Sequence, residues 1–489
     1  MVRTTLPRLL APVAAALLAA GCASTHGLAP VNRAVDADAL QTRRSLAGVT
    51  FSDAAFPART WWTAFGDPQL DALVTEALRD TPSLQAADAR VRQAQAQAGL
   101  ADAARKPDLS ASAQATAVQL PETLAPAPLG GDLKTSGVLR LDLQWAPDLW
   151  GGQRARYEAA VGQVRAAQAD AQAARLLLAS NVARTYVMLA QAFDAQDVAK
   201  REASRSGALS ELSRQRVRAG LDNQLQLRQA ESSIASAQQQ QQAAQQQIDA
   251  LRNALAALLG RGPDRGLEIA RPKLLAAPAP AVPALMSSEL LGHRPDVVAA
   301  RWRVEAATRG IDASKAAFKP AVNLSAIVGL AAPGLRDLFG SDALLAFGGP
   351  ALSLPIFDGE RLRADLAGRD ADYDLAVANY NQSLVAALRE VADAAQAARA
   401  LDAQAVSTAQ ARDAAQAALS LAQSRYRAGL GTQLDVLAAQ RPLLQFDQQL
   451  AALRAQRYAA AIDLDRALGG GLTPQAPASL PASIASQTP

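Results

Sequence analysis

The side chains that could do chemistry in this 489-residue chain are few, and none has the spacing of a catalytic or metal site. Cys22 is the only cysteine, which excludes an intrachain disulfide and a metal cluster built on several cysteines. The only histidines are His26 and His293, and neither belongs to an HExxH or similar metal-binding spacing. No GxSxG, P-loop or GxGxxG motif occurs. The sequence therefore predicts no enzyme, no cofactor and no metal, and it leaves the single thiol as the candidate for chemistry.

The surroundings of Cys22 are those of a lipid-attachment residue. Arg3 and Arg8 precede an apolar run over residues 9–20, and LAAGCAS then supplies small residues before the cysteine. Such a run is too short to span a bilayer as a mature helix. The pattern resembles a bacterial lipoprotein signal, which implies cleavage before Cys22, acylation of that residue and, without a following aspartate, an outer-membrane location. A plain secretory signal stays open as the alternative, because Ala19 stands where the lipoprotein pattern usually has leucine.

The composition is typical of long helices. Ala, Gln, Leu and Arg dominate, and aromatic residues make up only 4% of the chain. The formal net charge is +4, with basic and acidic residues interspersed rather than clustered. Because nucleic-acid binding needs clustered Lys and Arg, this pattern argues against a nucleic acid as partner.

The chain contains two colinear copies of one unit. RVRAGL in the first copy corresponds to RYRAGL in the second, and a helix that ends in Lys-Pro precedes a strand in both. Short loop insertions between such matches are expected in a duplicated unit. The matched segments are 82–112 with 295–326, 149–154 with 356–361, and 216–221 with 425–430.

Each copy predicts a helix, two strands, a very long helix, a tight turn and a returning helix. The first helix is expected over about residues 68 to 105, where Lys106-Pro107 ends it. The long helices are expected over 152–218 and 360–427, each about 100 Å long at 1.5 Å per residue. A glutamine tract in the first returning helix carries two series of residues spaced by seven, which indicates a packing seam rather than disorder. These series are Ile234, Gln241, Ile248, Leu255 and Ala237, Ala244, Leu251, Leu258.

Four strands of about ten residues are predicted, two in each copy. Apolar and polar side chains alternate over 108–120, 138–145 and 322–328, and a less regular strand is expected near 345–354. This is the length that a tilted membrane strand needs. An open sheet in a bilayer leaves edge N–H and C=O groups unpaired, so the strands require partners from other copies.

Three copies with four strands each would close a twelve-stranded barrel with room for a lumen. The long helices of the same chains would extend that barrel as a tube. The predicted fold class is therefore mainly α with membrane β: a trimeric twelve-stranded outer-membrane β-barrel continuous with a long periplasmic α-helical barrel. The predicted domains are a signal peptide 1–21, an anchored linker 22–60, a first repeat 61–260, an inter-repeat linker 261–284, a second repeat 285–470 and a disordered tail 471–489.

Four motifs in this order resemble the TolC-like outer-membrane efflux factors, specifically the lipoprotein branch that includes OprM and NodT-type proteins. They are WWTAFGDPQLDALVTEAL, RPDVVAARWRVEAATRGIDASKAAFKPAVNLS, LPIFDGERLRA and RYRAGLGTQLDVLAAQ. The resemblance covers nearly the whole mature chain. It implies a homotrimer in the outer membrane that serves as exit duct for an inner-membrane pump, joined to it by a periplasmic membrane-fusion adaptor.

The two RxRAGL segments are expected to be the helix turns at the periplasmic tips. Gly220 and Gly429 would take the left-handed conformation that ends a helix. A plain helix cap is one interpretation, because arginines near a helix end interact favourably with its dipole. The second interpretation is that Leu221, Leu430 and their neighbours also dock the adaptor. The candidate docking residues are Arg218, Gly220, Leu221, Arg427, Gly429, Leu430 and Thr432.

Gate candidates follow from the same resemblance. Asp435 stands where family members carry an inward carboxylate near the closed tip, and Ala438 replaces a second aspartate of many relatives. This departure argues against a doubled acidic ring. Arg216, Arg218, Arg427 and Asp222 are the candidates for charged contacts that keep the tip closed. The alternative is that Asp435 is a solvated helix residue.

The resemblance favours drug or small-molecule efflux with an RND-type pump. An exit duct for a type I (ABC) protein secretion system shares the fold and stays open. A non-conducting coiled-coil lipoprotein that tethers the envelope is a third possibility, although it needs no membrane strands. The sequence does not identify the cargo.

Overall fold

The computed structural model describes residues 24–36, 39–40, 44–47, 51–52, 56–121, 123, 131–283, 292–355 and 357–471. Cys22, the signal peptide and residues 472–489 of the predicted tail lie outside these residues. The chain forms two compact units, and each unit draws on both repeats. The first comprises 1–34, 90–167 and 300–380, and the second comprises 35–89, 168–299 and 381–489.

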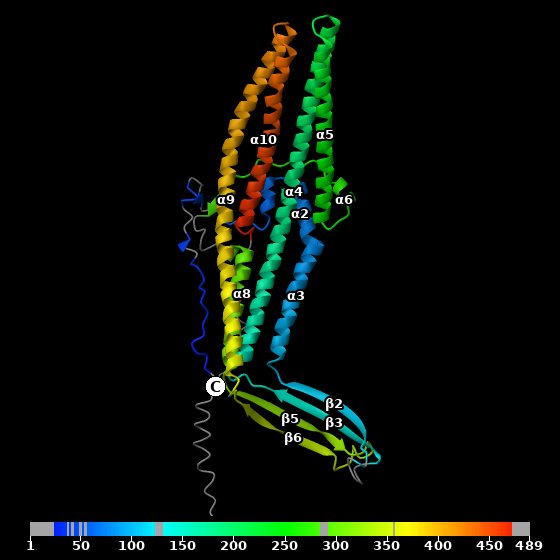
Figure 1. Cartoon of the computed structure of the whole chain (residues 1–489), viewed down its shortest axis with the longest axis vertical. Coiled ribbons are helices and arrows are strands. Elements are labelled where there is room, and N and C mark those ends of the chain that lie inside the picture. The colour runs from blue at the N-terminus through cyan, green and yellow to red at the C-terminus, as the bar shows by residue number, and fades with distance from the viewer. Residues whose placement is uncertain are drawn as a thin grey trace, which may run out of the picture. The chain divides into compact units, whose positions relative to one another are not determined.

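Long helices make up most of the described chain (Figure 1). The predicted long helices are confirmed as α4 (Gly152–Arg218) and α9 (Gly359–Arg427), of 67 and 69 residues. The returning helices are α5 (Gln224–Leu258) and α10 (Gln433–Ala467). The other elements outside the main sheet are η2 (Trp61–Phe65), α2 (Pro68–Asp80), α3 (Pro82–Ala103), α6 (Asp264–Leu267), α8 (Pro295–Ala316), β1 (Phe51–Ser52) and β4 (Val282–Pro283).

The first predicted helix is wrong as a single element, because the chain breaks at Thr81 between α2 and α3. Thr81 has an extended conformation with φ −89° and ψ 146°. Pro82 follows it, and a residue before proline is disfavoured in the α region. Proline fits the first turn of a helix, so α3 begins at Pro82.

The four predicted strands form one antiparallel sheet in the first unit, in the order β2-β3-β5-β6 (Figure 1). Their bounds are β2 Asp108–Gln119, β3 Leu133–Trp145, β5 Ala321–Ala332 and β6 Leu344–Ser353. The pairing of β3 with β5 joins the two repeats into a single sheet.

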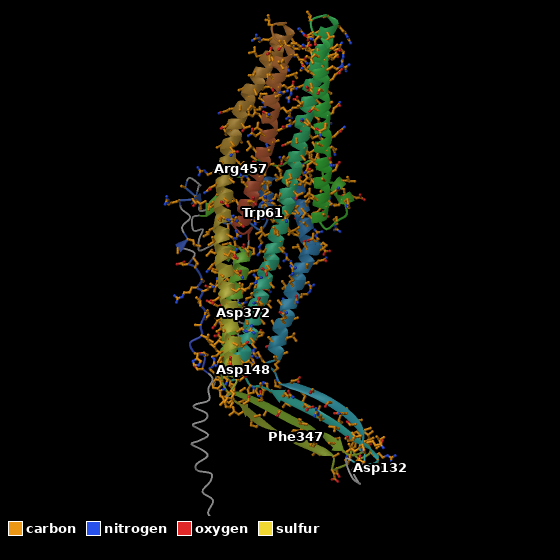
Figure 2. The ribbon with its side chains drawn as sticks, viewed as in Figure 1. Trp61, Asp132, Asp148, Phe347, Asp372 and Arg457 are labelled. Atoms are coloured by element: carbon orange, nitrogen blue, oxygen red, sulfur yellow. The ribbon has the colours of Figure 1, made fainter. Side chains whose placement is uncertain are left out.

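A core of aromatic and aliphatic side chains holds the second unit together. Trp61, Trp62 and Phe65 of η2 are buried, and Trp61 is labelled in Figure 2. Phe65 meets the ring of Tyr458 on α10 edge to face at 5.9 Å. Tyr186 of α4 is fully buried, and its hydroxyl donates to Asp67 at 2.7 Å. Burial of the Tyr186 phenol raises its pKa, so it stays a hydrogen-bond donor.

The glutamine tract is helical, as predicted. All eight positions of the two heptad series lie in α5, and each is buried or half-buried. Ile248 and Leu255 are fully buried. The seam therefore contributes to packing in the second unit. Within the described residues, no helix is long and apolar enough to cross a membrane.

Candidate functional site

The two predicted helix turns have the same local structure. Gly220 and Gly429 take φ values of 72° and 74°, in the left-handed region. In the first turn the Leu221 N–H donates to the Arg216 carbonyl at 2.9 Å, and in the second the Leu430 N–H donates to the Arg425 carbonyl at 2.8 Å. These bonds satisfy carbonyls that would otherwise lack partners at the helix ends. The predicted turns are thus present, and α5 and α10 start immediately after them.

Both returning helices begin with a capping box. In α10 the Thr432 side chain accepts from the Asp435 N–H, and the Thr432 N–H donates to the Asp435 carboxylate at 2.7 Å. Asn223 and Gln226 play the same parts in α5. The bonds from Thr432 hold the pKa of Asp435 below its ordinary value. Within one chain, the carboxylate proposed as a gate is therefore engaged in capping its own helix.

The two turns are joined by Arg216, Asp222 and Tyr426. The Arg216 guanidinium donates to both Asp222 oxygens, at 3.0 and 3.4 Å. It also lies over the Tyr426 ring, 4.6 Å from the centroid, and donates to the Tyr426 carbonyl at 3.2 Å. The Tyr426 hydroxyl donates to Asp222. We call Arg216, Asp222 and Tyr426 the tip cluster.

The tip cluster is largely excluded from solvent. Tyr426 is 1% exposed, and the Arg216 and Asp222 side chains are 15% and 10% exposed. Burial, and then the bond to Asp222, raise the pKa of the Tyr426 phenol. The bond to Asp222 raises the pKa of Arg216. Breaking the cluster would leave a buried charge without its partner, which is the costly way to lose such a pair.

Two of the three cluster residues stand where the repeats differ. The first turn reads RVRAGLD and the second RYRAGLG, so Tyr426 corresponds to Val217, and Asp222 corresponds to Gly431. The hydrogen bond from Tyr426 to Asp222 therefore exists only because the two copies differ at these positions. Sequence reasoning proposed Arg216 and Asp222 but missed Tyr426, and this comparison of the copies was the signal that could have found it.

A second polar network joins α4 to α10. The Gln440 amide of α10 donates to the Ser206 hydroxyl at 3.2 Å and to Glu202, both on α4. Arg205 of α4 pairs with Glu202 at 2.9 Å and lies 3.7 Å from the Asp447 carboxylate of α10. All five side chains are mostly buried. The contact between α4 and α10 is thus partly polar, which no sequence pattern indicated.

The remaining predicted tip residues are exposed and do not join the cluster. Arg218 and Arg427 are exposed, as are Gly220, Gly429 and Thr432. Leu221 and Leu430 are 64% and 71% exposed. Each turn carries a second exposed leucine four residues later, Leu225 in the first and Leu434 in the second. Each turn therefore presents two exposed leucines, one before the returning helix and one in its first turn, as a small apolar patch.

The sheet has one apolar and one mostly polar face. The strand register puts Leu109, Leu143 and Ala326 in one row, and Ala111, Leu141 and Val328 in the next. The opposite face includes the rows Ser110–Asp142–Ile327 and Ser112–Arg140–Gly329. There Arg140 pairs with Asp142 at 3.1 Å and donates to Ser112 at 3.0 Å. Phe347 of β6, paired with Ile327, is an apolar exception on this face (Figure 2).

No group of three or more metal-ligating side chains occurs within the described part of the chain. His293 stacks on the Phe56 ring at a centroid distance of 3.8 Å. His26 has a positive φ of 49° in the segment that follows Cys22. The two histidines thus take part in local packing and chain direction.

Comparisons with known proteins agree with this geometry. The model of the family described as "Outer membrane efflux protein" matches residues 73–261 and 286–470. The fusaric acid resistance protein FusA of Burkholderia cepacia is 39% identical over 370 residues, 74% of this chain and 69% of that protein. The multidrug resistance outer membrane protein MdtP of Escherichia coli strain K12 is 31% identical over 432 residues, 86% of this chain and 88% of that protein.

Among solved structures, the outer membrane protein VceC of Vibrio cholerae is 38% identical, with a TM-score of 0.80. The match covers 85% of this chain and all of VceC. The predicted family, and the predicted combination of long helices with a four-stranded sheet, are confirmed. The chain belongs to the outer membrane efflux protein family, and its place is the outer membrane.

Proposed function

We propose that three copies of this chain form the exit duct of a tripartite efflux system. The observation that carries the proposal is a sheet with two open edges, because β2 and β6 each have one strand partner in the described chain. In a bilayer each unpaired backbone group costs several kcal/mol, so β6 of one copy must pair with β2 of the next. Two copies would give eight strands with a filled interior, whereas three give twelve strands and a lumen.

The two faces of the sheet fit this arrangement. The face with Leu109, Leu141 and Val328 suits contact with lipid. The face with Ser112, Arg140 and Asp142 would line the lumen. The Arg140–Asp142 salt bridge would place one positive and one negative charge side by side in that lumen. The lumen would therefore be hydrated without a strong preference for one sign of charge.

The exposed leucines at the turns are the proposed adaptor-docking surface. Leu221 with Leu225, and Leu430 with Leu434, repeat the same apolar patch on two helix hairpins of each chain. Three chains would present six such patches. An adaptor whose own helices place apolar side chains between Arg218 and Leu221, or between Arg427 and Leu430, would use helix-in-groove recognition. The candidate residues Gly220, Gly429 and Thr432 would shape that surface.

The tip cluster is the proposed restraint on tip opening. It links the α4–α5 turn to the α9–α10 turn through Arg216, Asp222 and Tyr426. Separation of the two hairpins would break a charge-assisted hydrogen bond and a cation–π contact. Asp435 remains a second gate candidate, acting between chains rather than within one. Its capping bonds to Thr432 would have to be kept while it faced the axis.

The lipid anchor at Cys22 is also proposed, since that residue lies outside the described part. The segment behind it supports the assignment. The Val31 and Asn32 N–H groups donate to the Asp374 carboxylate of α9, at 3.0 and 2.7 Å. Leu28 packs on the apolar cluster of Phe318, Leu362 and Leu366. A segment fixed in this way would hold the acylated residue close to the start of α9, where the strands enter the membrane.

The relatives indicate the class of cargo and the type of pump, and they identify neither individually. The names of FusA and MdtP refer to resistance to fusaric acid and to several drugs. We therefore assign small molecules as cargo. Because the family is that of a duct, we assign the energy source to an inner-membrane pump, and the resemblance to the lipoprotein branch favours an RND-type pump. A type I protein secretion duct is the second candidate, and it rests on the shared fold alone.

Deletion of the gene, followed by complementation, tests the function. Accumulation of a fluorescent efflux dye should rise on deletion and return to the parental level with the wild-type chain. A Gly429→Pro variant should not restore efflux, because proline cannot take the left-handed conformation of that turn. Unchanged dye accumulation combined with loss of a secreted protein would assign the duct to type I secretion instead.

A further inference from the structure

A polar cavity of about 460 Å³ lies in the first unit, where α4 begins and α8 ends. Its charged lining consists of Arg154, Glu158, Arg309, Asp312, Lys315 and Lys319. Four of these side chains are cationic and two are anionic, so the lining carries an excess of two positive charges. Such an excess attracts an anion when the surrounding groups are already paired.

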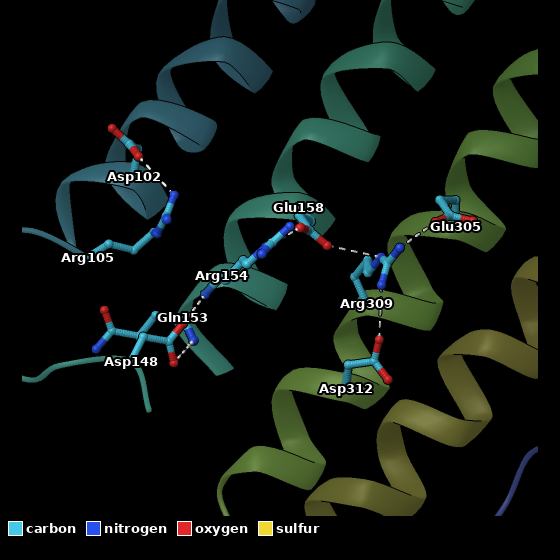
Figure 3. Close-up of polar contacts among 9 residues, drawn as sticks. All are labelled: Asp102, Arg105, Asp148, Gln153, Arg154, Glu158, Glu305, Arg309 and Asp312. Atoms are coloured by element: carbon cyan, nitrogen blue, oxygen red, sulfur yellow. Dashed lines mark hydrogen bonds and ion pairs between the residues drawn. The ribbon is translucent and has the colours of Figure 1, made fainter. Parts of the chain in front are cut away.

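The two carboxylates of the cavity are engaged by the arginines (Figure 3). Glu158 accepts from Arg154 at 2.8 Å and pairs with Arg309 at 3.2 Å. Asp312 and Glu305 lie 3.4 and 3.3 Å from the same Arg309 guanidinium. Neither Lys315 nor Lys319 has a carboxylate within ion-pair distance among the described residues. The two lysines are therefore the cationic groups of this lining that have no ion pair within the described residues.

The first repeat shows how the same position is neutralised. By the alignment of α3 with α8, Lys315 corresponds to Asp102, and Lys319 corresponds to Lys106. Asp102 and Lys106 form a salt bridge of 2.7 Å at the end of the first-repeat helix. In the second repeat the same two positions hold Lys315 and Lys319, and two positive charges four residues apart on a helix repel each other. An anion bound between the two lysines would supply the missing negative charge.

The cavity lies at the edge of the proposed membrane region. Lys319 is two residues before β5, and Trp150 is five residues after β3. The Lys319 ammonium lies 4.9 Å from the centroid of the Trp150 ring, whose indole N–H donates to the Pro320 carbonyl at 2.6 Å. Trp and Lys side chains with this proximity to membrane strands typically meet the headgroup layer of the bilayer.

Other groups near the lysines do not replace the anion. Asp370 of α9 interacts with Lys315 electrostatically without an ion pair. Burial raises the pKa of Asp370, and neither of its carboxyl oxygens has a hydrogen-bond partner among the described residues. Leu28, six residues after Cys22, packs beside Phe318, which directly precedes Lys319. The segment that follows the proposed lipid anchor and the cavity thus lie near the same helix end.

We propose that this cavity binds the phosphate group of an anionic membrane phospholipid, held between Lys315 and Lys319 with Trp150 at its rim. The phosphate would replace the carboxylate that Asp102 supplies in the first repeat. The lipid source follows from the position beside the membrane strands, and in this respect the inference rests on the proposed function. Lipid binding would fix the depth of the sheet in the inner leaflet without taking part in transport.

Native mass spectrometry of the purified full-length assembly in detergent tests the proposal. Titration with phosphatidylglycerol should give about one tightly bound lipid per chain, and phosphatidylcholine should bind more weakly. Each lysine removed should weaken phosphatidylglycerol binding about fivefold, so Lys315→Gln/Lys319→Gln should lose about 25-fold. Lys106→Gln is the matched control, since Lys106 is already paired with Asp102. It should bind the lipid as the wild type does.

Lys315→Asp is a second variant, in which a carboxylate within the chain replaces the proposed lipid phosphate. It restores to the second repeat the acid–base spacing of Asp102 and Lys106, and it should abolish the preference for phosphatidylglycerol while dye efflux continues. Equal binding by wild type and Lys315→Gln/Lys319→Gln, or no preference for the anionic lipid, would overturn the proposal. Displacement of the lipid by inorganic phosphate at similar concentration would show a site for free anions instead. Dye accumulation that does not change when the gene is deleted would count against the proposed function alone, because lipid binding is measured separately.

Discussion

The Tyr426 hydroxyl donates a hydrogen bond to the Asp222 carboxylate, and this bond joins the helix turn of the second repeat to that of the first. Neither partner has an equivalent in the other copy, since Val217 and Gly431 occupy the corresponding positions. Duplication alone would have given two separate turns. The difference between the copies is what connects them.

Tyr426→Phe should therefore raise the open probability of the reconstituted channel. The substitution keeps the ring under Arg216 and removes only the hydroxyl that bonds to a charged carboxylate, a bond worth about 2 kcal/mol. If the bond exists only in the closed tip, the open population should rise by about tenfold or more. Single-channel recording in planar bilayers measures the change.

Two further variants separate this hypothesis from its alternatives. Tyr458→Phe also removes a buried hydroxyl bond, in this case to the Leu275 carbonyl, and should leave gating unchanged. Asp435→Ala should raise conductance only if the gate lies at that carboxylate. An effect at Asp435 with none at Tyr426 would transfer the restraint from the tip cluster to contacts between chains.

Gly220→Ala and Gly207→Ala should change stability in opposite directions. Gly220 has a φ of 72°, and alanine there costs about 1 kcal/mol because its Cβ opposes the left-handed conformation. Gly207 lies within α4 with open space where a Cβ would be, so alanine should gain about 1 kcal/mol of helix stability. Thermal unfolding followed by circular dichroism compares the two. A stabilised Gly220→Ala variant would contradict the turn geometry.

Asp465 on α10 should make part of the stability depend on pH. Burial raises its pKa from 3.8 to about 7, so the folded chain favours the protonated carboxyl group. This contribution is fully present below pH 3.8 and is lost as the pH rises through about 7. Asp465→Asn should therefore raise the unfolding temperature at pH 8 and change it little at pH 4.

The matched control for that experiment is Asp463→Asn on the same helix. Asp463 pairs with Arg184 and lies 3.9 Å from Arg466, so its loss should destabilise the chain at pH 8. Identical melting curves for Asp465→Asn and wild type across this pH range would show that the carboxyl group is not buried in the assembled protein.

Leu221→Asp together with Leu430→Asp should abolish drug efflux while leaving the assembly intact. Both side chains are exposed, so the substitutions should cost little folding stability, yet a charge in an apolar docking surface is costly to desolvate. Drug susceptibility of complemented cells and the size of the purified assembly give the two readouts. Exposed Leu267 on α6 offers a control, and Leu267→Asp should support normal efflux.

The elements with a strict period were predictable from the sequence. The alternation of residues 138–145 fixed β3 and its two faces, and the absence of proline between Gly152 and Arg218 indicated α4. The glycines at 220 and 429 marked both turns. Local sequence determines each of these features, which is why they needed no tertiary information.

What the sequence did not predict depends on which faces meet. The break at Thr81 was readable from Pro82, but helical periodicity on both sides obscured it. The bonds between Glu202, Ser206 and Gln440 require α4 to face α10 at one rotation, and the spacing along either helix does not give that rotation. The tip cluster was partly predictable. Aligning the two turns identifies Tyr426 and Asp222 as residues that differ between the copies, but it does not show that they bond.

Disulfide cross-linking between β2 and β6 tests the central claim, a membrane pore shared by three chains. Ser112→Cys on the edge strand β2 is combined with a single cysteine at residue 345, 347, 349 or 351 of the other edge strand, β6, on the same face of the sheet. Oxidation in outer membranes should link chains at one of these positions and give dimers and trimers on denaturing gels, with nothing larger. Cysteines at the paired residues Leu141 and Val328 should cross-link within one chain only. Absence of interchain products at every scanned position, or a ladder that continues beyond three chains, would contradict the trimeric duct.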